Sequence, residues 1–182
     1  MNMFEITLLD KIRDIFSSPF LDKVMPIITR LGDDGIFWII LAIIFLCFRK
    51  TRKMGFSAAL AMIIGLLVVN IFLKNAVGRI RPYELNQGVT LLVERLSDYS
   101  FPSGHTAVSF EAATAIFIRN KKLGIPSLIL ATLIAFSRLY LYVHYPTDVL
   151  VGLVIGVGIA IFASFVVDKI YLKINKNKKT SS

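Results

Sequence analysis

The chain has two histidines, and each stands in a short polar motif beside an apolar run. His105 ends "PSGH" (102–105), and His144 lies within "SRLYLYVHYPTD" (137–148). An imidazole can exchange protons near neutral pH, and it can also attack phosphorus as a nucleophile. A titratable ring at a membrane border is costly unless it has a function. We therefore interpret both motifs as parts of a reactive site.

The neighbours of the two histidines predict different roles. Asp148 follows His144 by four residues, so its carboxylate can hold one ring nitrogen while the other attacks. His105 opens an apolar helix, where a bound phosphate ester would favour its protonated form. We predict that His144 forms a phosphohistidine and that His105 is first a general acid and then a base for water. The Ser103 hydroxyl and the N–H of Gly104 could hold a phosphate oxygen.

Three cations could neutralise an oxyanion beside these rings. In "KNAVGRIRP" (74–82), Lys74 and Arg81 share one helical face with Gly78 between them, if the helix runs through this stretch. Arg138 lies inside an apolar run, where an unpaired guanidinium is expensive, so we expect an anion nearby. Guanidinium groups match phosphate oxygens in pairs.

Each motif also has a plain structural interpretation. Interfacial Lys and Arg can be snorkelling anchors, Ser103 can be a helix cap, and Asp33 with Asp34 is expected to cap the helix that follows. The coincidence of all three motifs on one membrane side favours a single oxyanion pocket. The sequence shows no HExxH motif and no cluster of metal ligands, so we predict no metal and no other cofactor.

The elements that position these residues are membrane helices. The chain of 182 residues is 55% hydrophobic and 18% charged, with a mean hydropathy of +0.70, which is typical of an integral membrane protein. We predict an all-α bundle of about five spans. They are residues 35–48, 54–73, 102–118, 123–142 and 149–167.

A single domain is expected over residues 1–182, with an interfacial segment at 1–34, a helical bundle at 35–172 and a tail at 173–182. Residues 3–16 place Phe4, Leu8 and Ile15 near one face of a helix with charges opposite, so we expect this helix to lie in the membrane interface. A sixth crossing by residues 17–34 stays open.

The distribution of cations predicts the orientation. Residues 49–53, 119–122 and the tail from 168 hold twelve of the 21 Lys and Arg residues, with Asp168 as their one carboxylate. Because positive charge concentrates in cytoplasmic loops, we expect a cytoplasmic carboxy terminus and an extracytoplasmic site. The same asymmetry accounts for the basic excess, so nucleic acid is not an expected partner.

Three further features concern packing. Gly152, Gly156, Ala160 and Ser164 form a stripe of small residues that favours close helix contact. Glu111, about 12 Å along the helix from Ser103, could pair with Arg138 or close a polar network. The tyrosines near the outer border are expected to form an aromatic belt first and substrate contacts second: Tyr83, Tyr99, Tyr140, Tyr142 and Tyr145.

The motifs together carry a family resemblance. Lysine, six residues and Arg-Pro; Pro-Ser-Gly-His; and Ser-Arg, five residues, His, three residues and Asp resemble the three-part signature of the type 2 phosphatidic acid phosphatase superfamily, over residues 74–148. The resemblance implies a metal-independent membrane phosphatase of helical-bundle fold, with the roles given above. Its membrane members often have six spans. The spans argue against the soluble acid phosphatase and haloperoxidase branches.

We therefore expect an enzyme that hydrolyses the terminal phosphate of a lipid phosphate or diphosphate at the outer leaflet. By analogy with the family, undecaprenyl diphosphate ranks first among substrates, followed by phosphatidylglycerophosphate and phosphatidic acid. A binder or carrier of anionic lipids that does no chemistry is the alternative class. The sequence does not decide the lipid tail or the oligomeric state.

Overall fold

The computed structural model describes residues 3–180, and the elements in that range are helices joined by turns and loops. They are α1 (Met3–Phe16), α2 (Pro19–Arg30), η1 (Asp33–Gly35), α3 (Ile36–Cys47), α4 (Arg52–Gly65), η2 (Leu66–Leu73), α5 (Lys74–Val77), α6 (Pro82–Leu85), α7 (Gly104–Arg119), α8 (Lys121–Tyr140) and α9 (Pro146–Thr180). The expected all-α fold is confirmed. A single long loop of residues 86–103 joins α6 to α7.

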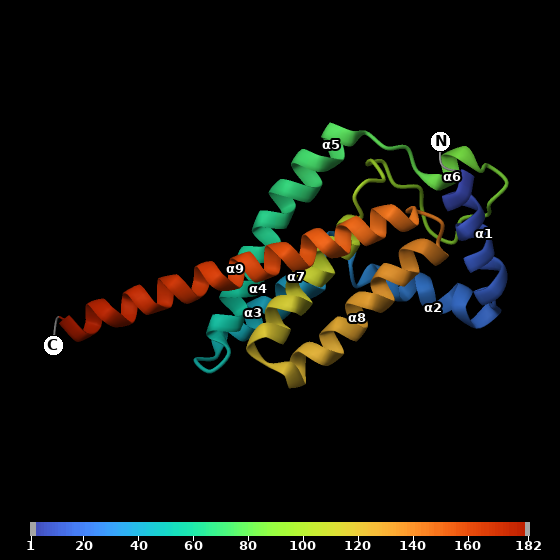
Figure 1. The fold of residues 1–182 in the computed structure, drawn as a ribbon. Coiled ribbons are helices and arrows are strands. Elements are labelled where there is room, and N and C mark those ends of the chain that lie inside the picture. The colour runs from blue at the N-terminus through green and yellow to red at the C-terminus, as the bar shows by residue number, and fades with distance from the viewer. Residues whose placement is uncertain (1–2, 181–182) are drawn as a thin grey trace.

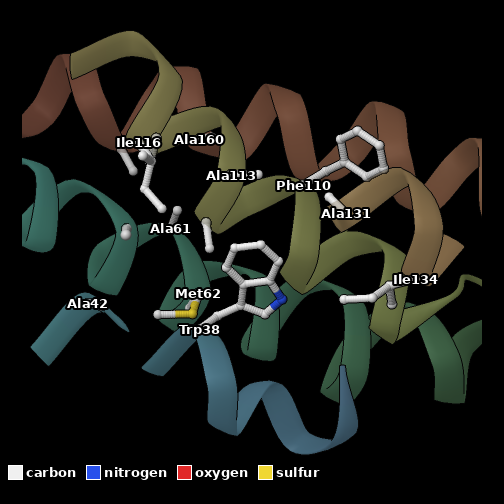
Figure 2. Packing of buried hydrophobic residues seen from close by; sticks show 14 of the residues in the cluster. Trp38, Ala42, Ala61, Met62, Phe110, Ala113, Ile116, Ala131, Ile134 and Ala160 are labelled. Atoms are coloured by element: carbon white, nitrogen blue, oxygen red, sulfur yellow. The ribbon is translucent and has the colours of Figure 1, made fainter. Parts of the chain in front are cut away.

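Helix α7 lies at the centre of the bundle, in contact with α4, α8 and α9 (Figure 1). Its small residues let these neighbours approach, and Ala112, Ala113 and Ala115 are fully buried or nearly so. Figure 2 shows the apolar core, in which Trp38 of α3 and Met62 of α4 lie below α7. The indole Nε1 of Trp38 donates to Ser109 Oγ at 3.0 Å.

The stripe of small residues on α9 packs against α7, as the sequence predicts. A Cβ on Gly152 would lie 2.7 Å from the backbone oxygen of Ser103, and one on Gly156 would lie 2.6 Å from that of Ala107. Ala160 is fully buried. The α7 and α9 backbones therefore touch without intervening side chains.

Among the described residues, three helical segments are long and apolar enough to cross a membrane: Arg52–Leu85, Lys121–Tyr140 and Pro146–Asn177. The first of them is interrupted at Gly78. Two of the five predicted spans form shorter helices, with 12 residues in α3 and 16 in α7. At a rise of about 1.5 Å per residue, both are shorter than a bilayer core of about 30 Å. Helix α7 is enclosed by its neighbours, so it need not meet lipid along its whole length.

The amino-terminal segment forms two amphipathic helices. Helix α1 has the predicted bounds, with Phe4 and Ile15 exposed and Leu9 buried against the bundle. Helix α2 has 12 residues, including Pro26, and packs against α8. Like α3, it is shorter than a bilayer core, and it is not among the described segments that are long and apolar enough to cross a membrane.

The loops that the cation count assigns to one membrane side come together at one end of the bundle. Asp168 of α9 forms ion pairs with Lys53 of α4 and with Arg119 of α7, the latter at 2.8 Å. Helices α1, α2 and α6 gather at the opposite end, far from the carboxy terminus (Figure 1). The two predicted sides are thus separate in space, and the direction across the membrane stays a prediction.

The tyrosines do not form the expected belt. Tyr83, Tyr140, Tyr142 and Tyr145 are buried, and Tyr99 alone among these five is exposed. Tyr140 donates to Asp22 of α2 and Tyr142 to Asp10 of α1. The amino-terminal helices cover this side of the bundle, and the phenol groups hold them there.

The contact between α7 and α9 gives a test of the packing. We expect Gly156→Ala to destabilise the protein by about 1–3 kcal/mol, because its Cβ would overlap the Ala107 carbonyl. Gly158→Ala is the matched control on the same helix, since a Cβ there meets nothing within 4 Å. It should keep or raise the thermal midpoint measured in detergent. Equal midpoints for the two variants would contradict the close backbone contact.

Candidate functional site

One cavity of about 830 Å³ brings five of the predicted site residues together at the α1 and α2 end of the bundle. These side chains come from three helices and two connections, and they are Lys74, Arg81, His105, Arg138 and His144. All but His105 are at least nine-tenths buried. The three motifs of the sequence therefore meet in one place.

Arg81 reaches the cavity by a route that the sequence does not predict. The helix ends at Val77, and Gly78 adopts a left-handed conformation (φ +61°) that suits glycine. The chain is extended at Arg81, and Pro82 begins α6 instead of ending the preceding helix. Lys74 and Arg81 thus face each other across a turn, and the expectation of one continuous helical face is wrong.

His144 lies in the turn between α8 and α9, with its two ring nitrogens in different surroundings. Nε2 is 3.4 Å from Arg81 Nη1, on the side of the cations. Nδ1 is 3.4 Å from Ser100 Oγ and 3.6 Å from Asp148 Oδ2. Burial and the nearby positive charges of Arg138, Arg81 and Lys74 hold the pKa of His144 well below its usual value. The ring is therefore neutral, with Nε2 toward the cavity.

Asp148 lies behind His144, in the first turn of α9, which begins at Pro146. Its carboxylate is fully buried, and Oδ2 accepts from Ser100 Oγ at 2.5 Å and from Tyr145 N at 2.9 Å. Its backbone oxygen accepts from Ser103 N at 3.0 Å, which ties this turn to the start of α7.

His105 stands in the first turn of α7, and its Nε2 lies 2.8 Å from Asp33 Oδ1. The expectation that Asp33 and Asp34 cap the next helix is wrong, because Gly35 (φ +66°) is the N-cap of α3 and no side chain caps it. The hydrogen bond with His105 lowers the pKa of Asp33. The sequence gives no signal for this contact, which joins residues 72 positions apart.

Neither Ser103 nor Gly104 lines the polar cavity. Ser103 is buried and is the N-cap of α7, and its hydroxyl accepts from Thr106 N and Thr106 Oγ1. It has the structural role that the sequence left as an alternative, and it does not line the cavity. Gly104 lies close to Lys74, since a Cβ there would be 3.7 Å from Lys74 Nζ.

Only one of the three guanidinium nitrogens of Arg138 donates a hydrogen bond to another described residue. Its Nη1 donates to Thr29 Oγ1 of α2, whereas Nε and Nη2 are buried and have no hydrogen-bond partner among the described residues. Buried guanidinium groups are normally paired, so an anion bound beside Arg138 would be stabilised. Of the two roles that the sequence leaves open for Glu111, the pairing with Arg138 does not occur.

Asp98, in the loop before α7, contacts two of the cations. Its Oδ2 accepts from Lys74 Nζ, and its Oδ1 accepts from Arg81 Nη2 at 2.5 Å. The carboxylate is half exposed to the cavity. Burial raises the pKa of Asp98, but the hydrogen bonds and charges of Lys74 and Arg81 outweigh it and lower the pKa to about 2. Asp98 is therefore negatively charged near neutral pH. It lies at the two cations where the sequence predicts a phosphate.

A second cavity, of about 970 Å³, adjoins the first. It is an apolar groove along α3, α4 and η2, and it shares Lys74, Asp98 and His105 with the polar cavity. Glu111 of α7 lies at its wall, packed against Gly65, and its Oε1 has no hydrogen-bond partner among the described residues. Charged and apolar surfaces thus meet at one mouth.

The chain belongs to the PAP2 superfamily, whose sequence profile matches residues 53–171. It is 31% identical to an undecaprenyl-diphosphatase of Sulfolobus acidocaldarius over 137 residues, which are 75% of this chain and 66% of that protein. It is 34% identical to the undecaprenyl-diphosphatase BcrC of Bacillus subtilis over 137 residues, 75% of this chain and 70% of that one. The chain thus spans about two thirds of the length of these relatives.

Solved structures agree with the family. Aquifex aeolicus LpxE has a TM-score of 0.77 and 32% identity, and the match covers 86% of this chain and 92% of that one. A PAP2-type phosphatidylglycerolphosphate phosphatase from Bacillus subtilis has a TM-score of 0.71 and 27% identity, with 95% and 87% covered. The family and the printed names of these relatives agree with the membrane phosphatase that the motifs predict.

The position of Asp98 gives a test. We expect Asp98→Asn to let orthovanadate inhibit phosphate release at a several-fold lower concentration, because the variant removes the anion that holds Lys74 and Arg81. Glu94→Gln is the matched control, since Glu94 is an exposed acid of the same loop and lines the same cavity. Weaker inhibition of the Asp98 variant would show instead that Asp98 holds the two cations in place for the phosphate.

Proposed function

We propose that the chain is a phosphatase that removes the terminal phosphate of a lipid phosphate or diphosphate. The observation that carries the proposal is the buried guanidinium of Arg138, whose Nε and Nη2 have no hydrogen-bond partner in the part of the chain that the structure describes, and which lines the same cavity as the neutral His144. A phosphate bound there would satisfy Arg138 and lie beside a nucleophilic ring nitrogen. A neutral ligand would leave the positive charge of the guanidinium without a counter-charge.

In the first half of the reaction, His144 Nε2 attacks phosphorus and the bond from phosphorus to the leaving oxygen breaks. Asp148 holds the other side of the ring, and His105 gives its proton to the leaving oxygen. Lys74, Arg81 and Arg138 neutralise the charge that spreads over the phosphoryl oxygens. The product is a phosphohistidine and the free lipid alcohol or monophosphate.

In the second half, water attacks the phosphohistidine while His105 accepts its proton. The bond between nitrogen and phosphorus breaks, inorganic phosphate is released and neutral His144 returns. The N–H groups at the start of α7, beginning with Gly104, are close enough to Lys74 to assist in holding an oxygen. Ser103 supports this turn as its N-cap.

The apolar groove supports a lipid as the substrate. It opens beside Lys74 and His105 and continues along Ile39 and Ile63 on α3 and α4. A headgroup phosphate in the polar cavity would place an attached hydrocarbon chain in this groove. The phosphate would then lie among polar groups and the chain among apolar ones.

Undecaprenyl diphosphate is the first candidate among substrates, because both sequence relatives described above carry that activity in their names. Phosphatidylglycerophosphate is the second, supported by the likeness to the Bacillus subtilis structure. Phosphatidic acid follows. A lipid binder that does no chemistry would not need a neutral, carboxylate-backed histidine at the cations.

We further propose that the site faces the extracytoplasmic side and the carboxy terminus the cytoplasm. The ion cluster of Lys53, Arg119 and Asp168 unites the cation-rich loops at the end opposite the cavity. Positive residues concentrate in cytoplasmic loops, which supports this direction.

His144 provides the test of the chemistry. We expect His144→Ala to lower phosphate release from a prenyl diphosphate, phosphatidylglycerophosphate or phosphatidic acid by more than about 1,000-fold, because the nucleophile is lost. The assay contains a chelator throughout, and the parent protein should keep its rate there. An unchanged melting temperature controls for folding. Full activity in the variant would rule out His144 as nucleophile, and a parent without activity on every lipid would favour the binder.

Orientation is tested by labelling. A cysteine replaces Gln87, in the loop after α6, in a Cys47→Ser background that removes the single native cysteine. A thiol reagent that does not cross membranes should label it in intact cells. A cysteine at Thr51, beside the Lys53 cluster, is the control and should react only after lysis. The reverse pattern would overturn the assigned direction.

A further inference from the structure

Asp148 has a third partner, Arg79, which is one of the six unspecified residues between Lys74 and Arg81 in the first motif. Arg79 Nη1 donates to Asp148 Oδ1 at 2.5 Å, while Ser100 and Tyr145 N hold Oδ2. The two oxygens of the buried carboxylate are therefore fixed by donors from different parts of the chain. Arg79 lies two residues before Arg81, but its side chain does not line either cavity.

Arg79 is itself held on three sides. Its Nη2 donates to Glu5 Oε2 at 2.6 Å, and its Nη1 also donates to Thr147 Oγ1 at 2.8 Å. Its guanidinium carbon lies 3.8 Å from the centre of the Tyr145 ring, a cation–π contact. Such a side chain has little freedom to move away from Asp148.

Glu5 connects this arrangement to the amino-terminal helix. It is only 4% exposed, and its Oε1 accepts from Thr147 N at 3.0 Å and from Thr147 Oγ1 at 2.6 Å. Burial raises the pKa of Glu5, yet the hydrogen bonds of Thr147 and the contact with Arg79 give a net lowering. A helix that only lay on the membrane would have no reason to bury a carboxylate, because an unpaired one is costly.

We propose that Arg79 and Glu5 are positioning residues for the reaction, which fix Asp148 and through it the ring of His144. Helix α1 is then part of the catalytic scaffold and not only a membrane anchor. The inference rests on the proposed function in one respect, the assignment of His144 as nucleophile.

The arrangement explains how His144 keeps its direction without a short bond to Asp148. At 3.6 Å, the contact between Nδ1 and Oδ2 alone would let the ring turn. A carboxylate clamped by Arg79, Ser100 and Tyr145 N offers a fixed acceptor for Nδ1–H. Nε2 then points toward Arg81. A misplacement of about 1 Å in such a geometry can cost about 100-fold in rate.

The charges around His144 give the sign of a pH effect. Arg81, Lys74, Arg138 and His105 disfavour its protonation, and Asp148 favours it. Arg79 offsets part of the charge of Asp148 and is in turn offset by Glu5. Loss of the positive charge at Arg79 leaves Asp148 uncompensated, so protonated His144 becomes easier to form. The acid limb of the kcat/KM profile should then move to higher pH.

The experiment compares Arg79→Gln, Arg79→Lys and Glu5→Gln with the parent, with phosphatidic acid and a prenyl diphosphate as substrates. We expect Arg79→Gln to lower kcat about 10- to 100-fold with KM little changed, and to shift the acid limb upward. Arg79→Lys should restore part of kcat, and Glu5→Gln should show a smaller loss. Arg13→Gln is the matched control on α1, because Arg13 bonds the loop oxygen of Thr90 and does not contact this network.

The outcomes separate the inference from the proposed function. A parent without activity, or full activity in His144→Ala, refutes the proposed function. If the parent is active and His144→Ala is not, then kcat and pH profiles of Arg79→Gln and Glu5→Gln that match Arg13→Gln overturn the positioning role. If Arg79→Gln fails to fold, the nearly isosteric Glu5→Gln and the charge-conserving Arg79→Lys are compared with Arg13→Gln in the same way.

Discussion

The site depends on the charge balance of three cations held together at one end of an apolar bundle. Lys74, Arg81 and Arg138 are all buried and line one cavity, although like charges repel strongly where water is scarce. Asp98 offsets two of them, and backbone oxygens of residues 98 and 143 accept from Arg81. Two nitrogens of Arg138, Nε and Nη2, have no hydrogen-bond partner within residues 3–180. An anionic ligand therefore relieves an existing imbalance, and a divalent phosphate does so better than any neutral group.

The same constraint explains the arrangement of the helices. The termini of α7, α8 and α9 must meet at one end of the bundle, so that His105, Arg138 and His144 can reach one cavity. Small residues on α7 and α9 make this possible, because they bring the two backbones into direct contact. The amino-terminal segment then closes the site from outside: Asp33 reaches His105, and Thr29 reaches Arg138. The amino-terminal segment, which the sequence predicts to lie in the membrane interface, thus supplies hydrogen-bond partners to two residues of the cavity.

Much of this could be predicted from the sequence, because residue types in membrane helices are strongly constrained. The all-helical fold, the α1 bounds and the gathering of the three motifs all follow from hydropathy and the cost of buried charge. The family membership agrees with the motif spacing. The stripe from Gly152 to Ser164 packs as its period indicates.

The rest was not accessible because it depends on contacts between distant residues. Glu5 meets Thr147 across 142 positions and Asp33 meets His105 across 72, and neither pair has a local pattern. The turn at Gly78 was missed because helical periodicity continues through it, whereas the glycine leaves the helix by a left-handed conformation. The buried tyrosines were missed for a similar reason, since only the fold shows that α1 and α2 cover them.

The covalent intermediate tests the central claim most directly. A lipid phosphate labelled with ³²P in its terminal phosphate is mixed with the protein and quenched within one turnover, and the labelled residue is identified in peptides. The account predicts an acid-labile, base-stable phosphoramidate on His144, which is absent from His144→Ala. Label on another side chain, or turnover with no labelled protein at any time, would contradict it.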